Sequence, residues 1–230
     1  MDWQGFAEQM ASMARTLLAQ PTVDATLKQI TESAHDLVGG CDAAGILLLE
    51  NKQARTLAPT EARVVECDRL QAQLGEGPCF DAARRTDGER VYRIRDLGEE
   101  PCWPHFVPQA SRLGIGSMMG FLLYTDDEDY GALNFYSRRP GAFTDVGEAA
   151  GWLLASHAAV ALASARTHAQ MEQAITTRHH IGEAMGILMA RHHVTEDQAF
   201  DVLRRYSQEK NIKLREVARL VCDTGSLGQP

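Results

Sequence analysis

Several features that mark secreted, membrane-spanning or zinc-stapled proteins are missing from this sequence. Its five cysteines are odd in number and no two form a Cys-x-x-Cys pair, which argues against a disulfide framework and a zinc ribbon. No apolar run approaches the roughly 20 residues of a transmembrane helix. The acidic Asp2, with no basic segment before an apolar one, predicts no signal peptide. We therefore expect a cytoplasmic protein that does not enter a membrane.

Sequence signatures of catalysis are missing as well. There is no Walker lysine and no Gly-x-Ser-x-Gly, and the Gly75-x-Gly77 pair lacks the third glycine of a dinucleotide site. The histidine pairs His179-His180 and His192-His193 do not have the i, i+4 spacing of a helical zinc site. We therefore expect no enzymatic activity, no cofactor and no metal.

What the chain does have is apolar content and an uneven charge. Hydrophobic residues make up 44% of 230 residues, enough for one large or two small domains with real cores. The net charge of −8 disfavours nucleic acid as a partner. Residues 166–230, however, hold nine Lys and Arg against eight Asp and Glu, whereas the rest holds 14 against 23. The C-terminal part is thus the better candidate for an anionic partner.

Three amphipathic helices are predicted near the C-terminus. Apolar residues recur at spacings of three and four within 181–189, 199–206 and 214–221. Thr195 and Gln198 have the form of a capping box, so a helix should begin at Thr195. Asn211 is a stop signal before the third helix. Three such short faces are buried only by packing on each other, which predicts a small all-α unit.

This segment closely resembles the ANTAR domain, the RNA-binding output module of transcription antitermination regulators. The matching residues are Ile181, Gly182, Ala184, Gly186, Ile187, Leu188, Met189, Thr195, Glu196, Asp197, Ala199, Phe200, Leu203, Arg204, Ser207, Gln208, Asn211, Lys213, Leu214, Arg215, Val217 and Ala218. Met185 departs from the pattern, because the family usually has lysine there. The resemblance implies that the target is a pair of short RNA hairpins whose unpaired loops are read.

Basic and polar side chains gather at the end of the second predicted helix and in the turn after it. Arg204, Ser207 and Gln208 share one helix face through their three and four spacing. Such a face can hold a phosphate backbone, while the planar guanidinium groups of arginines or the ring of Tyr206 stack on loop bases. The alternative interpretation is a helix face that is simply solvated. The predicted RNA-binding residues are Arg191, Arg204, Arg205, Ser207, Gln208, Asn211, Lys213 and Arg215, with Lys210 beside them.

The first 165 residues predict an α+β domain with a mainly antiparallel sheet. A helix over 2–19 carries an apolar stripe that either docks on its own domain or forms a dimer contact, and Pro21 ends it. A second helix runs from Val23 to the Gly39-Gly40 pair. The later segments are strands over 43–50, 55–59, 91–95, 116–124 and 130–136 and helices over 64–74, 78–85 and 103–106, with Thr144 as the N-cap of a final helix.

The segment from Leu70 to Ala163 resembles the GAF domains that precede ANTAR modules in actinobacterial regulators. The residues that carry this resemblance are 75–79, Trp103-Pro104, 113–117, 131–137 and 155–163. Cys102 stands where the family usually has arginine, and the strand through Gly120 lacks the common proline. A GAF pocket for a small apolar or aromatic molecule has as candidate lining residues Cys79, Trp103, Phe106, Met118, Phe121 and Phe135, which serve equally well as core. Cys79 at a helix start is also a candidate redox site, with a core cysteine as the alternative.

A long helix of about 147–190 links the two parts, because no proline interrupts it. A coiled-coil seam is predicted at Leu153, His157, Val160, Ser164, Thr167, Met171, Ala174, Arg178, Ile181, Met185 and Leu188. We expect this helix to pair two copies of the chain in a homodimer. The alternative is a helix packed on the sheet that breaks near Thr167.

The sequence thus predicts an N-terminal amphipathic helix (1–20), a GAF sensor domain (21–165) and an ANTAR domain (166–230). The preferred hypothesis is a signal-responsive antitermination regulator whose sensor biases how the ANTAR helices bind stem-loops of nascent RNA. The alternative is a small-molecule or redox sensor whose helical C-terminal part binds protein or DNA.

Overall fold

The computed structural model describes residues 3–50, 53–78, 81, 91–124 and 129–227. The chain falls into two compact units, residues 1–166 and 167–230. The fold class is the predicted one: an α+β domain with an antiparallel sheet flanked by helices, then a long helix and an all-α region. The predicted helix over 78–85 lies almost wholly outside the described residues, as do residues 125–128 between the strands predicted over 116–124 and 130–136.

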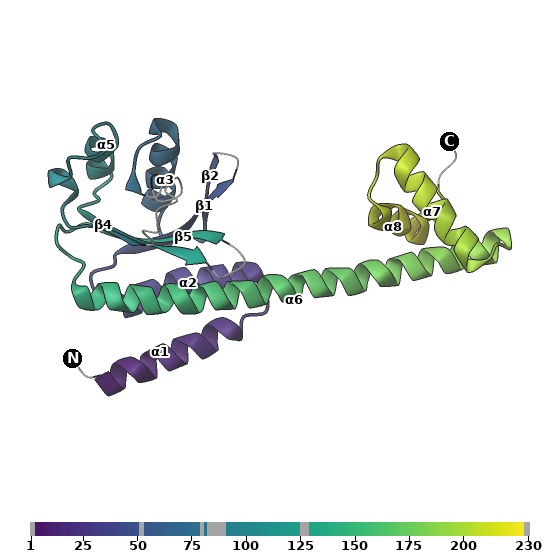
Figure 1. The fold of residues 1–230 in the computed structure, drawn as a ribbon, viewed down its shortest axis with the longest axis horizontal. Coiled ribbons are helices and arrows are strands. Elements are labelled where there is room, and N and C mark those ends of the chain that lie inside the picture. Colours follow the sequence, from purple (N-terminus) through teal and green to yellow (C-terminus); the bar gives the residue numbers. More distant parts are fainter. Residues whose placement is uncertain (1–2, 51–52, 79–80, 82–90, 125–128, 228–230) are drawn as a thin grey trace. The chain divides into compact units, whose positions relative to one another are not determined.

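The sensor unit is built on a five-stranded antiparallel sheet (Figure 1). Its strands are β1 (Ala43–Glu50), β2 (Gln53–Leu57), β3 (Val91–Ile94), β4 (Ser117–Tyr124) and β5 (Asp129–Ser137). Their order across the sheet is β2-β1-β5-β4-β3. β4 and β5, which match the strands predicted over 116–124 and 130–136, pair antiparallel, with Phe121 opposite Leu133 and Met118 opposite Tyr136.

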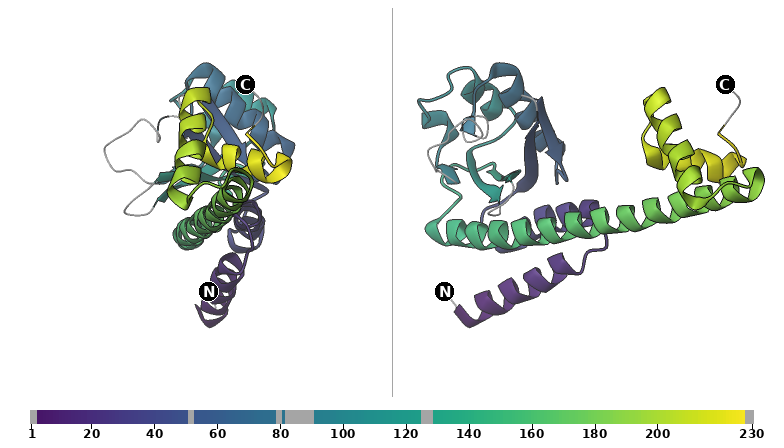
Figure 2. Two further views of the ribbon diagram at one scale, coloured as in Figure 1. Left: turned by 90° about the vertical axis from the view of Figure 1, so that its right-hand side faces the viewer. Right: turned by 45° about the vertical axis from the view of Figure 1, so that its right-hand side comes forward.

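Helices cover both faces of this sheet because side chains on successive strand positions point to opposite sides. On one face lies a layer made of α2 (Val23–Leu37) and the start of α6 (Asp145–His192), whose apolar side chains share a core with Phe121 and Phe135; α1 (Trp3–Leu18) packs on the outer side of this layer. On the other lie α3 (Ala62–Leu74), the short helix η1 (Leu97–Glu99) and α5 (Phe106–Arg112), around Met118 and Tyr136. The further views in Figure 2 show the same two layers.

The N-terminal helix α1 packs on its own domain. Met10, Met13 and Leu17 are buried in the same core as α2 and α6. Of the two readings of its apolar stripe, the structure therefore shows intramolecular docking, because these side chains are covered within one chain.

Helix α6 is anchored to the sheet where it begins. Arg93 on β3 donates from Nη1 to Asp145 Oδ1 at 2.7 Å and to Glu148 Oε2 at 2.9 Å. The backbone N–H of Gly147 donates to Thr144 Oγ1 at 3.2 Å, which confirms Thr144 as an N-cap. Among the described residues, α6 is the one helix with the length and hydropathy of a membrane span, and half of its most apolar window is buried within the fold.

The C-terminal unit packs the end of α6 against α7 (Glu196–Lys210) and α8 (Leu214–Thr224). Its core consists of Ala184, Leu188, Ala199, Leu203, Val217, Ala218 and Val221. The alanines let the helices approach closely. Ile181 and Met185 also pack against this core, whereas Met189, predicted on the same apolar face, is exposed.

This core corrects the C-terminal part of the predicted coiled-coil seam. Ile181, Met185 and Leu188 pack against α7 and α8 of their own chain, and Leu188 is buried there, so it is not available to a second copy. The earlier seam residues Leu153, Val160 and Met171 are exposed. Helix α6 runs unbroken past Thr167, so the predicted break there does not occur.

Candidate functional site

Helix α7 is capped at both ends, and the turn into α8 follows its C-terminal cap. Thr195 Oγ1 accepts from the backbone N–H of Gln198, and Gln198 Oε1 accepts from that of Thr195, which confirms the predicted capping box. Asn211 ends α7 in the left-handed region at φ 52°, and Ser207 Oγ donates to the carbonyl of Ile212 at 2.5 Å. The side chain of Ser207 therefore serves this turn.

The arginines of this unit divide into those with a partner and those without. Arg191 Nη1 donates to the carbonyl of Gly225 at 2.7 Å. Arg204 pairs with Asp201 at 2.8 Å, and the Arg205 Nε to Glu209 Oε1 distance is 3.8 Å. Three of the predicted RNA-binding cations are thus engaged within the chain, though the last two pairs are exposed and contribute less than about 1 kcal/mol each.

Besides Arg191, whose printed partner is a carbonyl, four cations are free of any carboxylate partner in residues 167–227, all of which the structure describes. They are Arg178, Lys210, Lys213 and Arg215, and each is exposed. Lys213 is the N-cap residue of α8 and Arg215 lies in its first turn. Gln208 and Asn211 are exposed beside them. Uncompensated cations near a helix–helix turn suit an anionic partner.

A groove of about 640 Å³ runs between α6, α7 and α8 within this unit. Ala174 and Ile181 supply apolar lining, and the ring of Phe200 is 37% exposed. The polar lining residues are Gln170, Gln173, Thr177, Arg178 and Arg215. Two of the four free cations therefore border an exposed aromatic ring, and no acidic residue lines the groove.

The predicted ligand-pocket residues of the sensor are divided between the two faces of the sheet. Phe106 and Met118 are buried in the cluster with α3 and α5, and Trp103 packs against it. Phe121 and Phe135 are buried in the opposite cluster with α2 and α6. The structure does not bring these residues together around one cavity. Cys79 lies outside the described residues.

Trp103 and the loop before α5 are held by two carboxylates. The indole Nε1 of Trp103 donates to Asp81 Oδ2 at 2.8 Å. Glu76 accepts from the backbone N–H groups of His105 and Phe106 at 2.9 and 3.0 Å. The His105 Nδ1 bond at 2.6 Å is the main cause that lowers the pKa of Glu76. The Gly75-Glu76-Gly77 motif thus caps α5.

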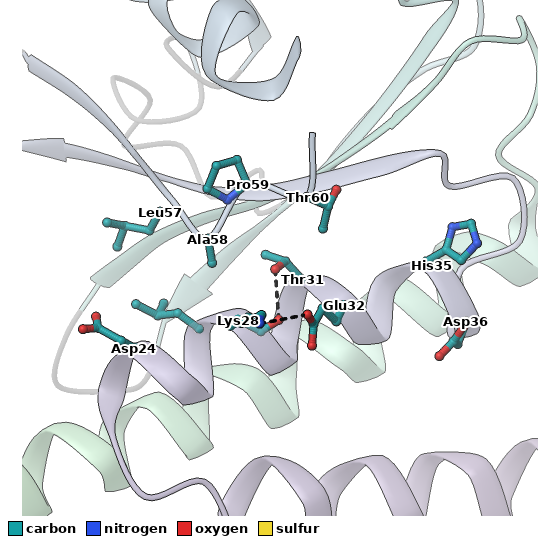
Figure 3. A pocket seen from close by; sticks show the side chains of 11 residues that line it. Asp24, Lys28, Thr31, Glu32, His35, Asp36, Leu57, Ala58, Pro59 and Thr60 are labelled. Carbon is teal, nitrogen blue, oxygen red and sulfur yellow. Dashed lines mark hydrogen bonds and ion pairs between the residues drawn. The ribbon is translucent and has the colours of Figure 1, made fainter. Parts of the chain in front are cut away.

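A cavity of about 700 Å³ lies between α2 and the segment that follows β2 (Figure 3). Leu27, Leu57, Ala58 and Pro59 supply its apolar lining. Its polar residues are Asp24, Lys28, Thr31, Glu32, His35, Asp36 and Thr60. His35 donates from Nδ1 to the carbonyl of Cys41 at 3.0 Å, since a carbonyl only accepts. No aromatic residue predicted for the ligand pocket lines this cavity.

Family models cover most of the chain. A model of the GAF domain matches residues 20–163, and a model of the ANTAR domain matches residues 169–221. The chain is a GAF–ANTAR protein. In general terms this pair of regulatory, generally non-catalytic domains makes it an antitermination regulator under the control of a sensor.

Solved structures resemble this GAF–ANTAR protein in fold. The GAF domain of a phosphoenolpyruvate-protein phosphotransferase from Coxiella burnetii is 18% identical, with a TM-score of 0.57 over 74% of this chain and 99% of that one. The photosensory core module of a Stigmatella aurantiaca phytochrome is 13% identical, with a TM-score of 0.63 over 90% of this chain and 45% of that one. At these identities the likeness establishes the fold alone. No curated protein matches the chain.

Sequence reasoning missed two residues of this GAF–ANTAR protein that the groove brings together. Phe200 was noted only as part of the ANTAR pattern, and Arg178 only as a charge within an apolar seam. The charge of Arg178 was the signal that could have identified it. An arginine at a seam position indicates that this part of the helix faces solvent or a ligand.

Proposed function

We propose that this protein binds stem-loops of nascent RNA through its ANTAR domain and so prevents termination of transcription. The observation that carries the proposal is the set of unpartnered cations Lys210, Lys213 and Arg215 at the α7–α8 turn. The predicted residues Arg204, Arg205, Ser207, Gln208 and Asn211 belong to the last turns of α7 and its C-cap, whereas Arg191 lies at the other end of α8, where it binds the carbonyl of Gly225. Cations without carboxylate partners supply the salt-dependent part of nucleic-acid affinity.

The protein acts as a homodimer in this proposal, so that one assembly holds two stem-loops. Support comes from an exposed apolar stripe on α6, formed by Leu153, Val160, Met171 and Ile175. Their exposed fractions run from 40% to 70%, which is unusual for apolar side chains of this size on one helix face.

The GAF domain binds a small molecule and transmits its presence to α6. The cavity between α2 and the end of β2 has the volume of a ligand site and an apolar lining with polar groups. Helix α2 shares its core with the first turns of α6. The effect of a ligand bound against α2 is therefore transmitted to the linking helix through packed side chains. Mass spectrometry of the purified protein tests for a retained small molecule.

The RNA proposal is tested by filter binding to an RNA with two short stem-loops and to a DNA duplex of the same length. We expect preference for the RNA and a steep loss of affinity with salt. Lys213→Ala should weaken binding and reduce the salt slope by about 0.7, as expected for one lost single-strand phosphate contact.

Arg219→Ala is the matched control, because the Arg219 Nε lies 3.9 Å from the Asp223 carboxylate on the far part of α8. Equal binding of RNA and DNA, or equal effects of the two substitutions, would count against the proposal and in favour of a sensor that acts on protein or DNA.

A further inference from the structure

We propose that the groove between α6, α7 and α8 is a nucleotide-binding site, in which one unpaired RNA base stacks on Phe200 while Arg178 and Arg215 hold the adjoining phosphate. This inference rests on the proposed RNA-binding function and names the place where a loop base is held. It adds Phe200 and Arg178, which lie outside the predicted basic turn.

The exposed ring of Phe200 is the first observation. Helix α7 buries Ala199 and Leu203 in the core, while Phe200 beside them remains 37% exposed and borders the groove. An aromatic face at the edge of an apolar groove is a sequence-tolerant platform for a base, because every base has a π-face.

The charge around the ring is the second observation. The groove has two guanidinium groups, those of Arg178 and Arg215, and neither has a carboxylate partner in the fully described segment 167–227. None of its lining residues is acidic. Guanidinium groups match phosphate oxygens in pairs of hydrogen bonds. The side chains of Gln170, Gln173 and Thr177 offer both donors and acceptors to a base edge.

The groove continues into the predicted RNA-binding face. Phe200, Arg204 and Gln208 follow each other at intervals of four along α7, so they form one row on its surface. An RNA strand with one base stacked on Phe200 can therefore continue along this row toward Gln208 and the cations of the α7–α8 turn.

A second copy of α6 suits this groove less well. In a parallel coiled-coil pair the same positions of the two helices meet, so Arg178 would face the cations of the other copy with no acid among the lining residues. Like charges at such a seam are unfavourable. A nucleotide brings a negative charge for the two guanidinium groups and an aromatic plane that stacks on Phe200.

The test uses the full-length protein and an RNA of two stem-loops in which each unpaired loop position is replaced in turn by an abasic nucleotide. One loop position should matter strongly for the parent protein. Phe200→Leu keeps an apolar side chain but removes the ring, and should weaken binding roughly 5- to 150-fold, the range for loss of one stacked base. In this variant the abasic replacement at that position should cost no further affinity, while Phe200→Tyr should bind like the parent.

Matched controls are available on α8. Leu220 has the same exposed fraction as Phe200, 37%, but does not line the groove, so Leu220→Ala should leave RNA binding unchanged. Arg178→Gln and Arg215→Gln should each weaken binding, whereas Arg219→Gln should not. Circular dichroism establishes that each variant is folded.

Three results would overturn the inference, and they can be told apart. If Phe200→Leu binds RNA like the parent while Lys213→Ala weakens it, the groove holds no base but the RNA-binding function stands. If Phe200→Leu changes the monomer–dimer equilibrium and not RNA affinity, the groove is a protein interface. If the parent binds no RNA with two stem-loops, both this inference and the proposed function fall.

Discussion

The phenol of Tyr136 on β5 donates a hydrogen bond to the buried carboxyl group of Asp68 on α3, across 3.0 Å. Thr56 on β2 donates to the other oxygen at 2.7 Å. Asp68 is only 1% exposed, and this burial raises its pKa from 3.8 to about 6 against the smaller opposing effect of the two donors. A single titrating group therefore joins two strands and a helix of the GAF domain.

Stability should depend on pH through this group. Because the pKa of Asp68 is higher in the folded protein than in the unfolded chain, the folded protein binds the proton more tightly below about pH 6. The contribution of Asp68 is fully present below pH 4 and is lost as the pH rises through 6. Asp68→Asn removes this dependence, so its free energy of unfolding relative to the parent should rise by up to about 3 kcal/mol between pH 4 and 7.

Urea unfolding of both proteins from pH 4 to 8 measures that difference. Tyr136→Phe provides a second variant: it removes a donor that lowers the pKa of Asp68, so the fall in stability should move to higher pH. Parallel curves for the parent and Asp68→Asn would show that the carboxyl group does not titrate as described.

Gly151 should be required for the packing of α6 on the sheet. A methyl group there would overlap the ring of the buried Phe121 and lie 3.2 Å from Phe135. Gly151→Ala should therefore destabilise the GAF domain by about 1 to 3 kcal/mol, the usual cost of overpacking a core.

Gly186 provides the contrast within the same helix, because no atom lies within 4 Å of a methyl group placed there. Gly186→Ala should stabilise its unit by up to about 1 kcal/mol through helix propensity. Thermal unfolding measures both. A Gly151→Ala protein as stable as the parent would contradict the close packing.

The proposed dimer should depend on the exposed stripe of α6. Val160 and Met171 are 58% and 60% exposed, and a glutamate at either would leave an unpaired carboxylate in a symmetric seam from each copy. Burying such a charge costs several kcal/mol, so Val160→Glu and Met171→Glu should weaken the dimer roughly 100-fold or more.

Ala169→Glu is the control, because Ala169 is exposed about 160° around the helix from Met171. Sedimentation equilibrium at several concentrations distinguishes the variants. A parent protein that is monomeric throughout, or a control that behaves like Val160→Glu, would rule out the stripe as the dimer contact.

Signals between near neighbours in the sequence were sufficient to predict much of the ANTAR domain. The Thr195 and Gln198 side chains and Asn211 predicted where α7 begins and ends, since caps depend on residues only three or four positions apart. The three amphipathic faces likewise predicted a shared core.

Tertiary partners were harder to predict. The spacing of Ile181, Met185 and Leu188 indicates a buried helix face, but the same spacing is satisfied by α7 and α8 of one chain or by a second copy. The groove around Phe200 requires three helices to meet, which no local pattern reports. For the sensor pocket a usable signal was overlooked: Met118 and Phe121 are three positions apart on one strand, so they must lie on opposite faces.

The ion pair between Arg204 and Asp201 has a consequence for how RNA arrives. Both side chains are more than half exposed, at 59% and 63%, so water already screens their attraction and separating them costs less than about 1 kcal/mol. Asp201 thus holds the guanidinium in a defined rotamer while no nucleic acid is bound, and a phosphate can take its place at little cost. Arg204 would then exchange one anion for another when RNA docks. The RNA strand would gain a contact from a guanidinium group that is already preorganised.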